Sequence, residues 1–238
     1  MKLSDAKILL VDDEPMLLEI FSLWLTNGKG SSLLSTAADG QQALAMATET
    51  SYDLLITDLK MPRMDGISLM RHLAESRRTP PSIIFVSGFG NVDEREMYGL
   101  GVEAFLSKPM TRETLISVGE AVLAPRYSLW INRFDVPPRQ SILIEASDFS
   151  ERAHDGGIVL GRGGFSARYV GPVAPGKVSF DCHLASDGSR MTGEGFIRWR
   201  SKTEGTLGIE FSFLEESCRA EIAERITNTI PRAFIPAL

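Results

Sequence analysis

Polar residues that could do chemistry follow four short apolar runs of this sequence: Asp12 and Asp13, Asp58, Ser87, and Lys108. Three carboxylates that converge on one cleft repel each other and need a cation. Oxygen ligands with open positions suit Mg²⁺, which keeps several waters and bridges to phosphate. A carboxylate can also act as a nucleophile toward phosphorus. The set indicates phosphoryl transfer, in which Mg²⁺ and the Lys108 ammonium would neutralise charge and the Ser87 hydroxyl would donate a hydrogen bond.

The elements that must position these residues alternate in type over the first 123 residues. Short apolar or β-rich runs predict strands at 7–11, 32–37, 53–57, 82–86 and 103–107. Helical spacing predicts helices at 14–27, 39–48, 66–76, within 91–99 and at 111–123. Five such units in a row predict a parallel sheet with helices on both faces. The carboxyl ends of parallel strands meet at one edge, so the candidate residues are expected to converge there.

Each candidate residue also has a simpler interpretation. Asp13 could cap the helix that begins near Pro15, Ser87 could be a turn residue, and Lys108 could be a solvated charge. Asp58 could merely open a loop. Their joint appearance at successive strand ends favours a shared site over four separate structural roles.

Composition and charge limit the classes of protein to which this chain can belong. Hydrophobic residues make up 43% and charged residues 24% of the 238 residues, which is ordinary for globular domains. No apolar run approaches the roughly 20 residues of a membrane span, and the N-terminus is a poor secretory signal. Cys182 and Cys218 show no paired spacing, which fits a reducing compartment. We therefore expect a cytoplasmic protein.

The second half of the chain differs in charge and period. Residues 1–123 carry 11 Lys and Arg against 17 Asp and Glu, whereas the remainder carries 14 of each. After a proline-containing linker at 124–138, β-rich segments occur at 141–146, 177–184, 192–200 and 206–214. This pattern predicts a mainly antiparallel β-barrel domain. Ser212 and Glu215 form a capping-box pattern that predicts a C-terminal helix through about residue 228.

Four motifs of the first half resemble the receiver domain of two-component response regulators. They are D-D-E at 12–14, D-L-K-M-P-R-M-D-G at 58–66, V-S-G at 86–88, and G-V-E-A-F-L-S-K-P at 101–109. The resemblance covers residues 5–123. It implies a flavodoxin-like, doubly wound α/β fold with a five-stranded parallel sheet in the order 2-1-3-4-5.

The resemblance also implies roles for individual residues. Asp58 would be the phosphorylation site, Asp12 and Asp13 would bind Mg²⁺ with it, and Ser87 and Lys108 would contact the phosphoryl group. Further implied features are a switch position at Phe105, a cis peptide bond before Pro109, and tuning of dephosphorylation by Lys60 and Phe89.

The second half resembles a PilZ domain over about residues 135–228, through its layout and the segments 163–168, 193–200 and 208–211. PilZ domains commonly bind cyclic di-GMP through R-x-x-x-R and [D/N]-x-S-x-x-G. Here Arg133 and Arg139 are six residues apart, and Val159 and Gly161 stand at the acidic or amide position and the serine position. Arg133, Arg139, Arg162 and Arg168 could form a variant site for cyclic di-GMP or another anion, or could be solvated charges on a protein-binding surface.

The sequence thus predicts a response regulator with a receiver at 1–123, a linker at 124–138 and a PilZ-like domain at 139–238. A sensor histidine kinase or phosphotransfer protein would phosphorylate it, and the receiver offers a route to a homodimer. In the alternative, the β domain is an adaptor that docks on motility or exopolysaccharide machinery without binding nucleotide. No basic recognition helix follows residue 123, which disfavours DNA binding. No substrate pocket is evident, so we expect no enzyme.

Overall fold

The computed structural model describes residues 1–28, 33–75, 81–88, 93–124, 130–131, 133, 136–150, 156–229, 231 and 233–236. The chain divides into two compact units. The first comprises Met1–Val92 and Leu100–Ala124, and the second comprises Asp93–Gly99 and Pro125–Leu238. Most of the predicted linker, and Phe89, lie outside the described residues. No helix among the described residues combines the length and apolarity that a bilayer crossing requires.

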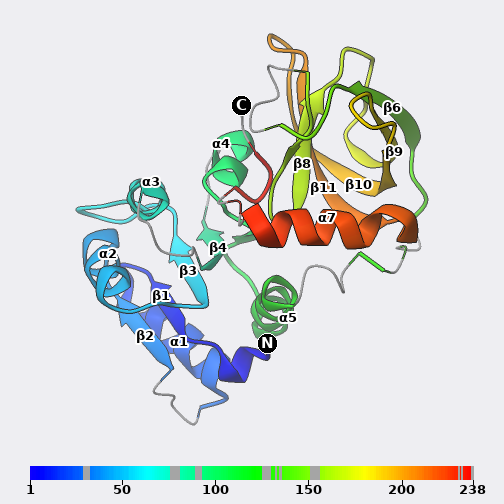
Figure 1. The fold of residues 1–238 in the computed structure, drawn as a ribbon. Helices are drawn as coiled ribbons and strands as arrows, with labels where there is room; N and C mark the ends of the chain where they lie inside the picture. The colour runs from blue at the N-terminus through cyan, green and yellow to red at the C-terminus, as the bar shows by residue number, and fades with distance from the viewer. Residues whose placement is uncertain are drawn as a thin grey trace. The chain divides into compact units, whose positions relative to one another are not determined.

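The first unit alternates strands and helices, as the sequence predicts (Figure 1). Its strands are β1 (Ile8–Val11), β2 (Leu34–Ala37), β3 (Leu54–Asp58), β4 (Ser82–Ser87) and β5 (Ala104–Ser107). Its helices are η1 (Leu3–Asp5), α1 (Pro15–Thr26), α2 (Gly40–Glu49), α3 (Gly66–Glu75) and α5 (Arg112–Leu123). Between β4 and β5 the chain also forms α4 (Glu94–Gly99), which belongs to the second unit.

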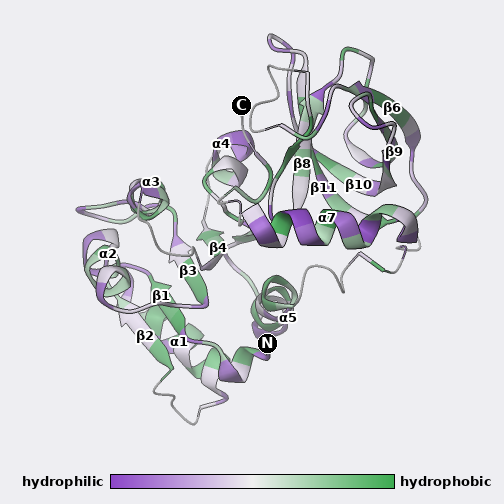
Figure 2. Cartoon of the chain, viewed as in Figure 1, coloured by the Kyte–Doolittle hydropathy of each residue, from purple (hydrophilic) through white to green (hydrophobic). Residues whose placement is uncertain are grey.

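The five strands form one parallel sheet in the order β2-β1-β3-β4-β5, as predicted. Helices α1 and α5 pack together, and α2 packs with α3. Strands β1 and β3 are buried along their whole length because helices cover both faces of the sheet. Their uninterrupted apolar sequences are visible as hydrophobic strands in Figure 2.

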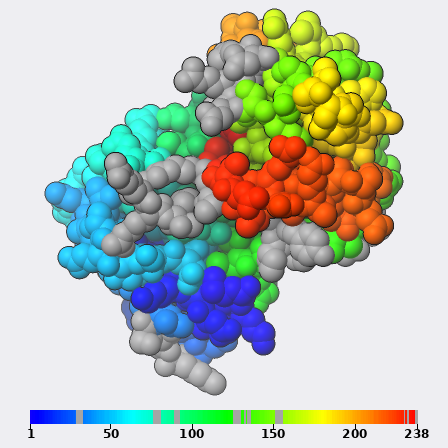
Figure 3. All heavy atoms as spheres, viewed as in Figure 1, coloured from blue at the N-terminus to red at the C-terminus, as the bar shows by residue number. Residues whose placement is uncertain are grey.

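The second unit is built on six strands and a C-terminal helix. The strands are β6 (Gln140–Ala146), β7 (Val159–Leu160), β8 (Gly164–Arg168), β9 (Gly176–Leu184), β10 (Arg190–Ser201) and β11 (Thr206–Leu214). Helix α7 (Glu216–Thr229) follows β11 and forms a continuous ridge on the surface in Figure 3. The four strands predicted in this half all occur, with ends within two residues of the expected ones.

The predicted mainly antiparallel barrel is borne out in part, since four strand pairs of the described sheet are antiparallel and one is parallel. The strands form a mixed sheet in the order β6-β9-β10-β11-β8-β7, which curls into a half-barrel (Figure 1). Strand β6 pairs in parallel with β9, with Ile142 opposite Phe180, and β7 and β8 lie between these two strands in the chain. Side chains alternate along β6, so that Ile142 and Ile144 are buried whereas Leu143 is exposed. The parallel pairing is a long-range choice that alternation within each strand does not reveal.

The inside of the half-barrel is an apolar core with aromatic residues at its centre. Phe165 lies against Phe180 and Phe211, with ring centroids 5.1 and 5.5 Å apart. Trp130, from the predicted linker, is also buried and meets Phe211 edge to face at 5.1 Å. Part of the predicted linker therefore belongs to the core of the second unit.

The predicted capping box is wrong. Ser212 lies inside β11, and its side chain is buried there, while α7 begins only at Glu216. The strand continues through the serine because Phe211 and Leu214 are needed in the apolar core of the second unit.

Helix α2 illustrates how local contacts and the sheet support each other. The Asp39 carboxylate accepts a 2.8 Å hydrogen bond from the Gln42 amide at the start of the helix. The same carboxylate forms an ion pair with Arg63, from the loop after β3. The Gln42 amide first, and Arg63 in addition, hold the pKa of Asp39 below its ordinary value. Asp39 thus joins the start of α2 to the loop that follows β3.

Replacing Asp39 with alanine is expected to lower the free energy of unfolding of the first unit by about 1–2 kcal/mol at neutral pH, because α2 loses its N-cap and the loop loses an ion pair. Chemical denaturation followed by circular dichroism measures the change. A depressed folded-state pKa means that the contribution exists above the unfolded pKa and is lost as pH falls through the folded pKa. The difference from wild type should therefore shrink in acid.

Glu19→Ala is the matched control, because Glu19 is an exposed acid on α1. Its free energy of unfolding should stay within about 0.5 kcal/mol of wild type. Equal destabilisation by the two substitutions would contradict the role given to Asp39.

Candidate functional site

The parallel register brings the candidate residues to one edge of the first unit's sheet. Val11 pairs with Thr57, so Asp12 and Asp58 emerge side by side from β1 and β3. Ser87 ends β4, and Lys108 follows the last residue of β5. The Lys108 amide donates a 2.8 Å hydrogen bond to the Ser87 carbonyl, which holds the two strand ends together.

Asp12, Asp13 and Asp58 form a compact group of oxygen ligands. One carboxylate oxygen from each lies within 4.8 Å of the other two. Asp12 and Asp58 are buried, whereas Asp13 is exposed and leaves the group open to solvent. Three hard oxygen donors with an open side fit Mg²⁺, which needs few protein ligands and keeps waters for its other positions.

Lys108 provides the positive charge of this edge. Its ammonium lies 2.8 Å from Asp12 Oδ2 and 3.6 Å from Asp58 Oδ1. Burial works to lower the pKa of Lys108, but the hydrogen bond and charge of Asp12, with Asp58 in addition, raise it overall. Burial raises the pKa of Asp58, against the opposing influence of Lys108. Lys108 therefore remains a cation that can approach either carboxylate.

Two other residues implied by the receiver resemblance have defined surroundings. The peptide bond between Lys108 and Pro109 is cis, as that resemblance implied. Phe105 is half-buried, and its ring centroid lies 6.2 Å from that of the buried Phe85. The switching role of Phe105 stays a prediction. Phe89 lies outside the described residues.

The loop after Asp58 contains contacts that sequence reasoning missed. Arg63 adopts a left-handed φ of 64°, which is uncommon for a residue with a side chain. Its ion pair with Asp39 holds this conformation, and the Gly40 amide donates a 3.1 Å hydrogen bond to the neighbouring Met64 carbonyl. A Cβ at Gly66 would clash with the Asp58 carbonyl. In the sequence, these contacts were indicated only by the segment P-R-M-D-G, which contains both Arg63 and Gly66.

The arginines of the predicted anion site occupy different elements of the second unit. Arg162 lies two residues before β8 and Arg168 is the last residue of that strand, and burial lowers the pKa of Arg162 to about 10. Arg139 lies just before β6, where its amide donates to the Lys177 carbonyl. A variant anion site at these four arginines stays a prediction.

Arg133 is neutralised by carboxylates of its own unit. It forms ion pairs with Glu215 and, at 3.4 Å, with Glu194, and its guanidinium lies 4.5 Å from the centroid of the Phe213 ring. Glu194 also forms a 2.6 Å ion pair with the buried Lys177. Carboxylates that satisfy Arg133 in this way oppose the binding of an anion there.

Comparisons with known proteins bear on the first unit. Residues 8–119 match the family described as the response regulator receiver domain. Residues 8–119 are a receiver domain. Its acidic cluster is of the kind at which receiver domains bind Mg²⁺.

Curated relatives match about half of this chain. The uncharacterized transcriptional regulatory protein YesN of Bacillus subtilis is 34% identical over 122 residues, which cover 50% of this chain and 32% of YesN. A protein-glutamate methylesterase/protein-glutamine glutaminase of Anaeromyxobacter dehalogenans is 35% identical over 117 residues, covering 49% of this chain and 33% of that protein. The chain thus spans about a third of the length of these relatives.

Among solved structures, the chemotaxis response regulator CheY4 of Vibrio cholerae is similar to the receiver. It is 30% identical, and the match covers 50% of this chain and 98% of CheY4, with a TM-score of 0.45.

Replacing Lys108 with methionine separates metal binding from phosphoryl transfer in this receiver. The variant should bind Mg²⁺ at least as tightly as wild type, because a competing positive charge is removed from the carboxylates. Its labelling by acetyl phosphate should fall at least tenfold, because a charge that stabilises the transferring group is lost. Calorimetric titration with Mg²⁺ and intact-protein mass spectrometry measure the two effects.

Lys7→Met is the control, since Lys7 is an exposed cation of the same unit. It should leave both quantities unchanged. Wild-type labelling of the Lys108 variant would remove that residue from the phosphoryl site.

Proposed function

We propose that this chain is a two-component response regulator that is phosphorylated on Asp58 and whose phosphorylation controls the second unit. The proposal is carried by one observation: Asp58 shares its edge of the sheet with two further carboxylates and with the Lys108 ammonium. A nucleophile, a ligand set for a divalent ion and a cationic clamp are the parts that phosphoryl transfer to a carboxylate requires.

The transfer step follows from this arrangement. An oxygen of Asp58 attacks the phosphorus of a phosphohistidine and forms a new P–O bond. The P–N bond breaks with its electron pair on the imidazole, which takes a proton from solvent. Asp12, Asp13 and Asp58 would hold Mg²⁺, which would offset the negative charge of the incoming phosphoryl group. Lys108 and the Ser87 hydroxyl then stabilise the phosphoryl oxygens, and Phe105 responds to the movement of Ser87.

The partners follow from the receiver and are part of the proposal. A sensor histidine kinase or phosphotransfer protein supplies the phosphoryl group, and a downstream protein reads the result. We also propose that this chain has no enzymatic activity of its own. The receiver match does not imply this, because one relative that shares it is a protein-glutamate methylesterase. DNA binding is disfavoured because the described part of the second unit consists of a curled sheet with α4 and α7. Helix α7 also carries an acidic residue, Glu216, in its first turn.

The second unit is proposed to be a PilZ-like output domain that acts through protein contacts. Its layout supports the resemblance, since β9, β10, β11 and β8 form a continuous antiparallel run that is followed by a C-terminal helix. The ion pairs of Arg133 and the separation of Arg162 from Arg168 favour the adaptor alternative over a cyclic di-GMP receptor.

Asp58→Asn is expected to abolish Mg²⁺-dependent labelling by acetyl phosphate, because an amide is a poor nucleophile. Intact-protein mass spectrometry after incubation with acetyl phosphate and Mg²⁺ measures the labelled fraction. Chelation of Mg²⁺ should likewise abolish labelling of the wild-type protein.

Asp53→Asn is the matched control. Asp53 immediately precedes β3, at the opposite end of that strand from Asp58, where its carboxylate accepts a 2.7 Å hydrogen bond from the Lys7 amide. An asparagine there retains an acceptor, so labelling should equal that of wild type. Undiminished labelling of the Asp58 variant would defeat the proposed function.

Cyclic di-GMP is expected to show no saturable binding to the full chain at micromolar concentrations. Isothermal titration, run in parallel with Arg139→Ala and with a PilZ protein that carries both intact motifs, provides the measurement. Micromolar binding that disappears in the Arg139 variant would instead establish a nucleotide receptor.

A further inference from the structure

Three exposed cations of the second unit stand apart from its ion-paired ones. One group of cations forms ion pairs with carboxylates of the same unit: Arg133, Lys177, Arg190, Arg198 and Arg225. Arg168, Arg200 and Lys202 are exposed, and none of them forms an ion pair with a carboxylate in the described part of the chain. Their charges are therefore available to a negatively charged partner.

These three cations gather where β8 ends and β10 turns into β11. Arg168 pairs in the sheet with Thr206, and Arg200 pairs with Leu207, the next residue of β11. Because successive residues of a strand point to opposite faces, the two arginines flank this end of the sheet on both sides. Lys202 follows β10 directly.

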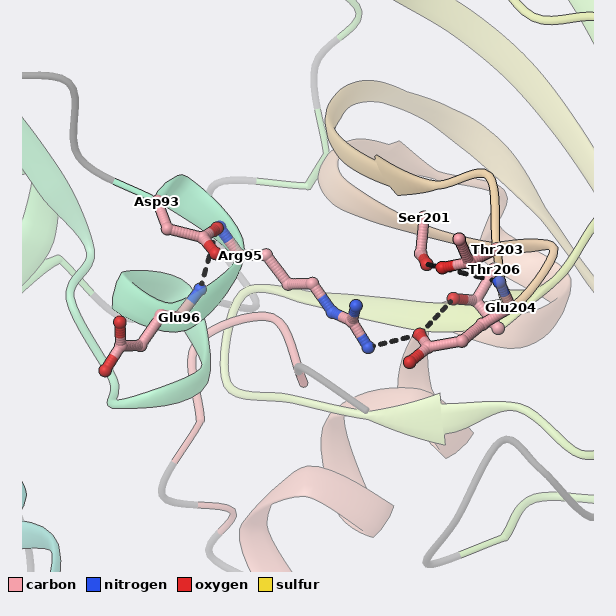
Figure 4. A network of polar contacts seen from close by, with 7 residues as sticks. All are labelled: Asp93, Arg95, Glu96, Ser201, Thr203, Glu204 and Thr206. Atoms are coloured by element: carbon pink, nitrogen blue, oxygen red, sulfur yellow. Dashed lines mark hydrogen bonds and ion pairs between the residues drawn. The ribbon is translucent and has the colours of Figure 1, made fainter.

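The turn between β10 and β11 keeps this end of the sheet positive. The Ser201 hydroxyl accepts a 3.3 Å hydrogen bond from the Glu204 amide, which holds the turn together (Figure 4). The Glu204 carboxylate forms an ion pair with Arg95 of α4, as the dashed line in Figure 4 marks. The one acid of the turn is thus already neutralised and does not offset the charge of Lys202.

The loop between β8 and β9, residues 169–176, is apolar and uncharged. Its sequence is Y-V-G-P-V-A-P-G, and Val170 is 79% exposed. Three further residues of this apolar loop are exposed: Pro172, Ala174 and Pro175. Single apolar residues on a surface are ordinary, whereas several in one exposed loop indicate a contact surface.

The apolar loop is fixed to the strands that carry the cations. The Tyr169 amide donates a 2.7 Å hydrogen bond to the Gly205 carbonyl of the turn, and the Arg200 guanidinium donates one of 3.0 Å to the Gly171 carbonyl. Loop and turn therefore lie side by side, and both reach the surface at the top of Figure 3. Together they present an apolar centre with positive charges around it.

This combination favours an anionic lipid surface over other anionic partners. Cations alone would suit a nucleic acid, but its phosphate backbone offers no apolar layer that could take up Val170. An extended peptide would need free backbone groups, and the Tyr169 amide at the end of β8 is already paired. A membrane interface offers both lipid phosphates and an apolar layer beneath them.

We propose that the apolar loop, with Arg168, Arg200 and Lys202, is a docking surface for an anionic membrane. The cations contact lipid phosphates, and Val170 enters the boundary between headgroups and acyl chains. The contact is peripheral and reversible, because three charges and one loop bind far more weakly than a spanning helix. This inference goes beyond the proposed function and does not depend on phosphorylation of Asp58.

Cosedimentation of the full chain with vesicles tests the proposal. The vesicles contain phosphatidylcholine alone, or phosphatidylcholine and phosphatidylglycerol in equal amounts. Wild type should bind only the anionic vesicles, and binding should weaken as NaCl is added, because salt screens the charges. The double variant Arg168→Gln/Lys202→Gln should lower the partition coefficient about fivefold for each charge removed. Arg200 is kept because it also holds the apolar loop.

Substitutions of Val170 test the apolar part separately. Val170→Ser should lower the partition coefficient at least threefold, because less apolar surface leaves water. Val170→Trp should raise it at least threefold, because tryptophan favours the membrane interface. A gain of binding in this variant cannot arise from misfolding.

Matched controls remove the same groups elsewhere in the chain. Lys2→Gln/Lys7→Gln removes two exposed charges from the receiver, and Val136→Ser removes a valine of the second unit that is 61% exposed. Both should bind anionic vesicles as wild type does. Thermal unfolding followed by circular dichroism verifies that every variant is folded.

Equal binding of wild type to both kinds of vesicle, or wild-type binding by the Arg168/Lys202 variant, would overturn the proposal. Tighter binding to duplex DNA or to polyglutamate than to vesicles, unaffected by Val170→Ser, would assign the cations to another class of partner and overturn the lipid assignment. Soluble glycerol phosphate in millimolar amounts should not displace the vesicles, and full displacement would reduce the surface to a phosphate site. None of these outcomes bears on labelling of Asp58 by acetyl phosphate, so the two proposals fail separately.

Discussion

The mutual repulsion of three carboxylates is the constraint on which the receiver depends. Their oxygens approach within 4.8 Å, and two of the three side chains are buried. Such a group is stable only if cations neutralise its negative charge and if the backbone prevents the carboxylates from moving apart. Lys108 provides part of the compensation, and the fully buried strands β1 and β3 hold Asp12 and Asp58 in place. A slip of one residue in either strand would turn a carboxylate into a helix-covered face.

The surroundings of Asp58 show how tertiary contacts enforce that geometry. Arg63 is held in a left-handed conformation by Asp39, which also caps α2. Gly66 lets the start of α3 approach the Asp58 backbone. Local strain of this kind persists only where surrounding contacts determine the conformation, and it gathers at functional edges. The receiver therefore positions its nucleophile from both sides, through β3 and through the loop after it.

The second unit uses similar residue types for packing. Glycines 163 and 208 admit the rings of Phe234 and Trp199, and Arg133 is satisfied by Glu194 and Glu215. The contacts of these glycines and of Arg133 are internal to the unit. Residue types alone therefore do not identify a ligand site in this unit, because the same residues can serve its packing.

The sequence by itself determined the alternation of strands and helices in the receiver and the residues of its acidic edge, whereas the strand order came from the family resemblance of its motifs. It could do so because strands buried on both faces are continuous apolar runs, and each is followed at once by the polar residue that its carboxyl end presents. It also located β6, β9, β10, β11 and α7, whose alternation or helical composition is local. Only the tertiary structure decided the parallel pairing of β6 with β9, the place of Ser212 inside β11 and the partners of Arg133. Each of these depends on contacts between residues far apart in the chain, and such contacts leave no periodic pattern in the segments that make them.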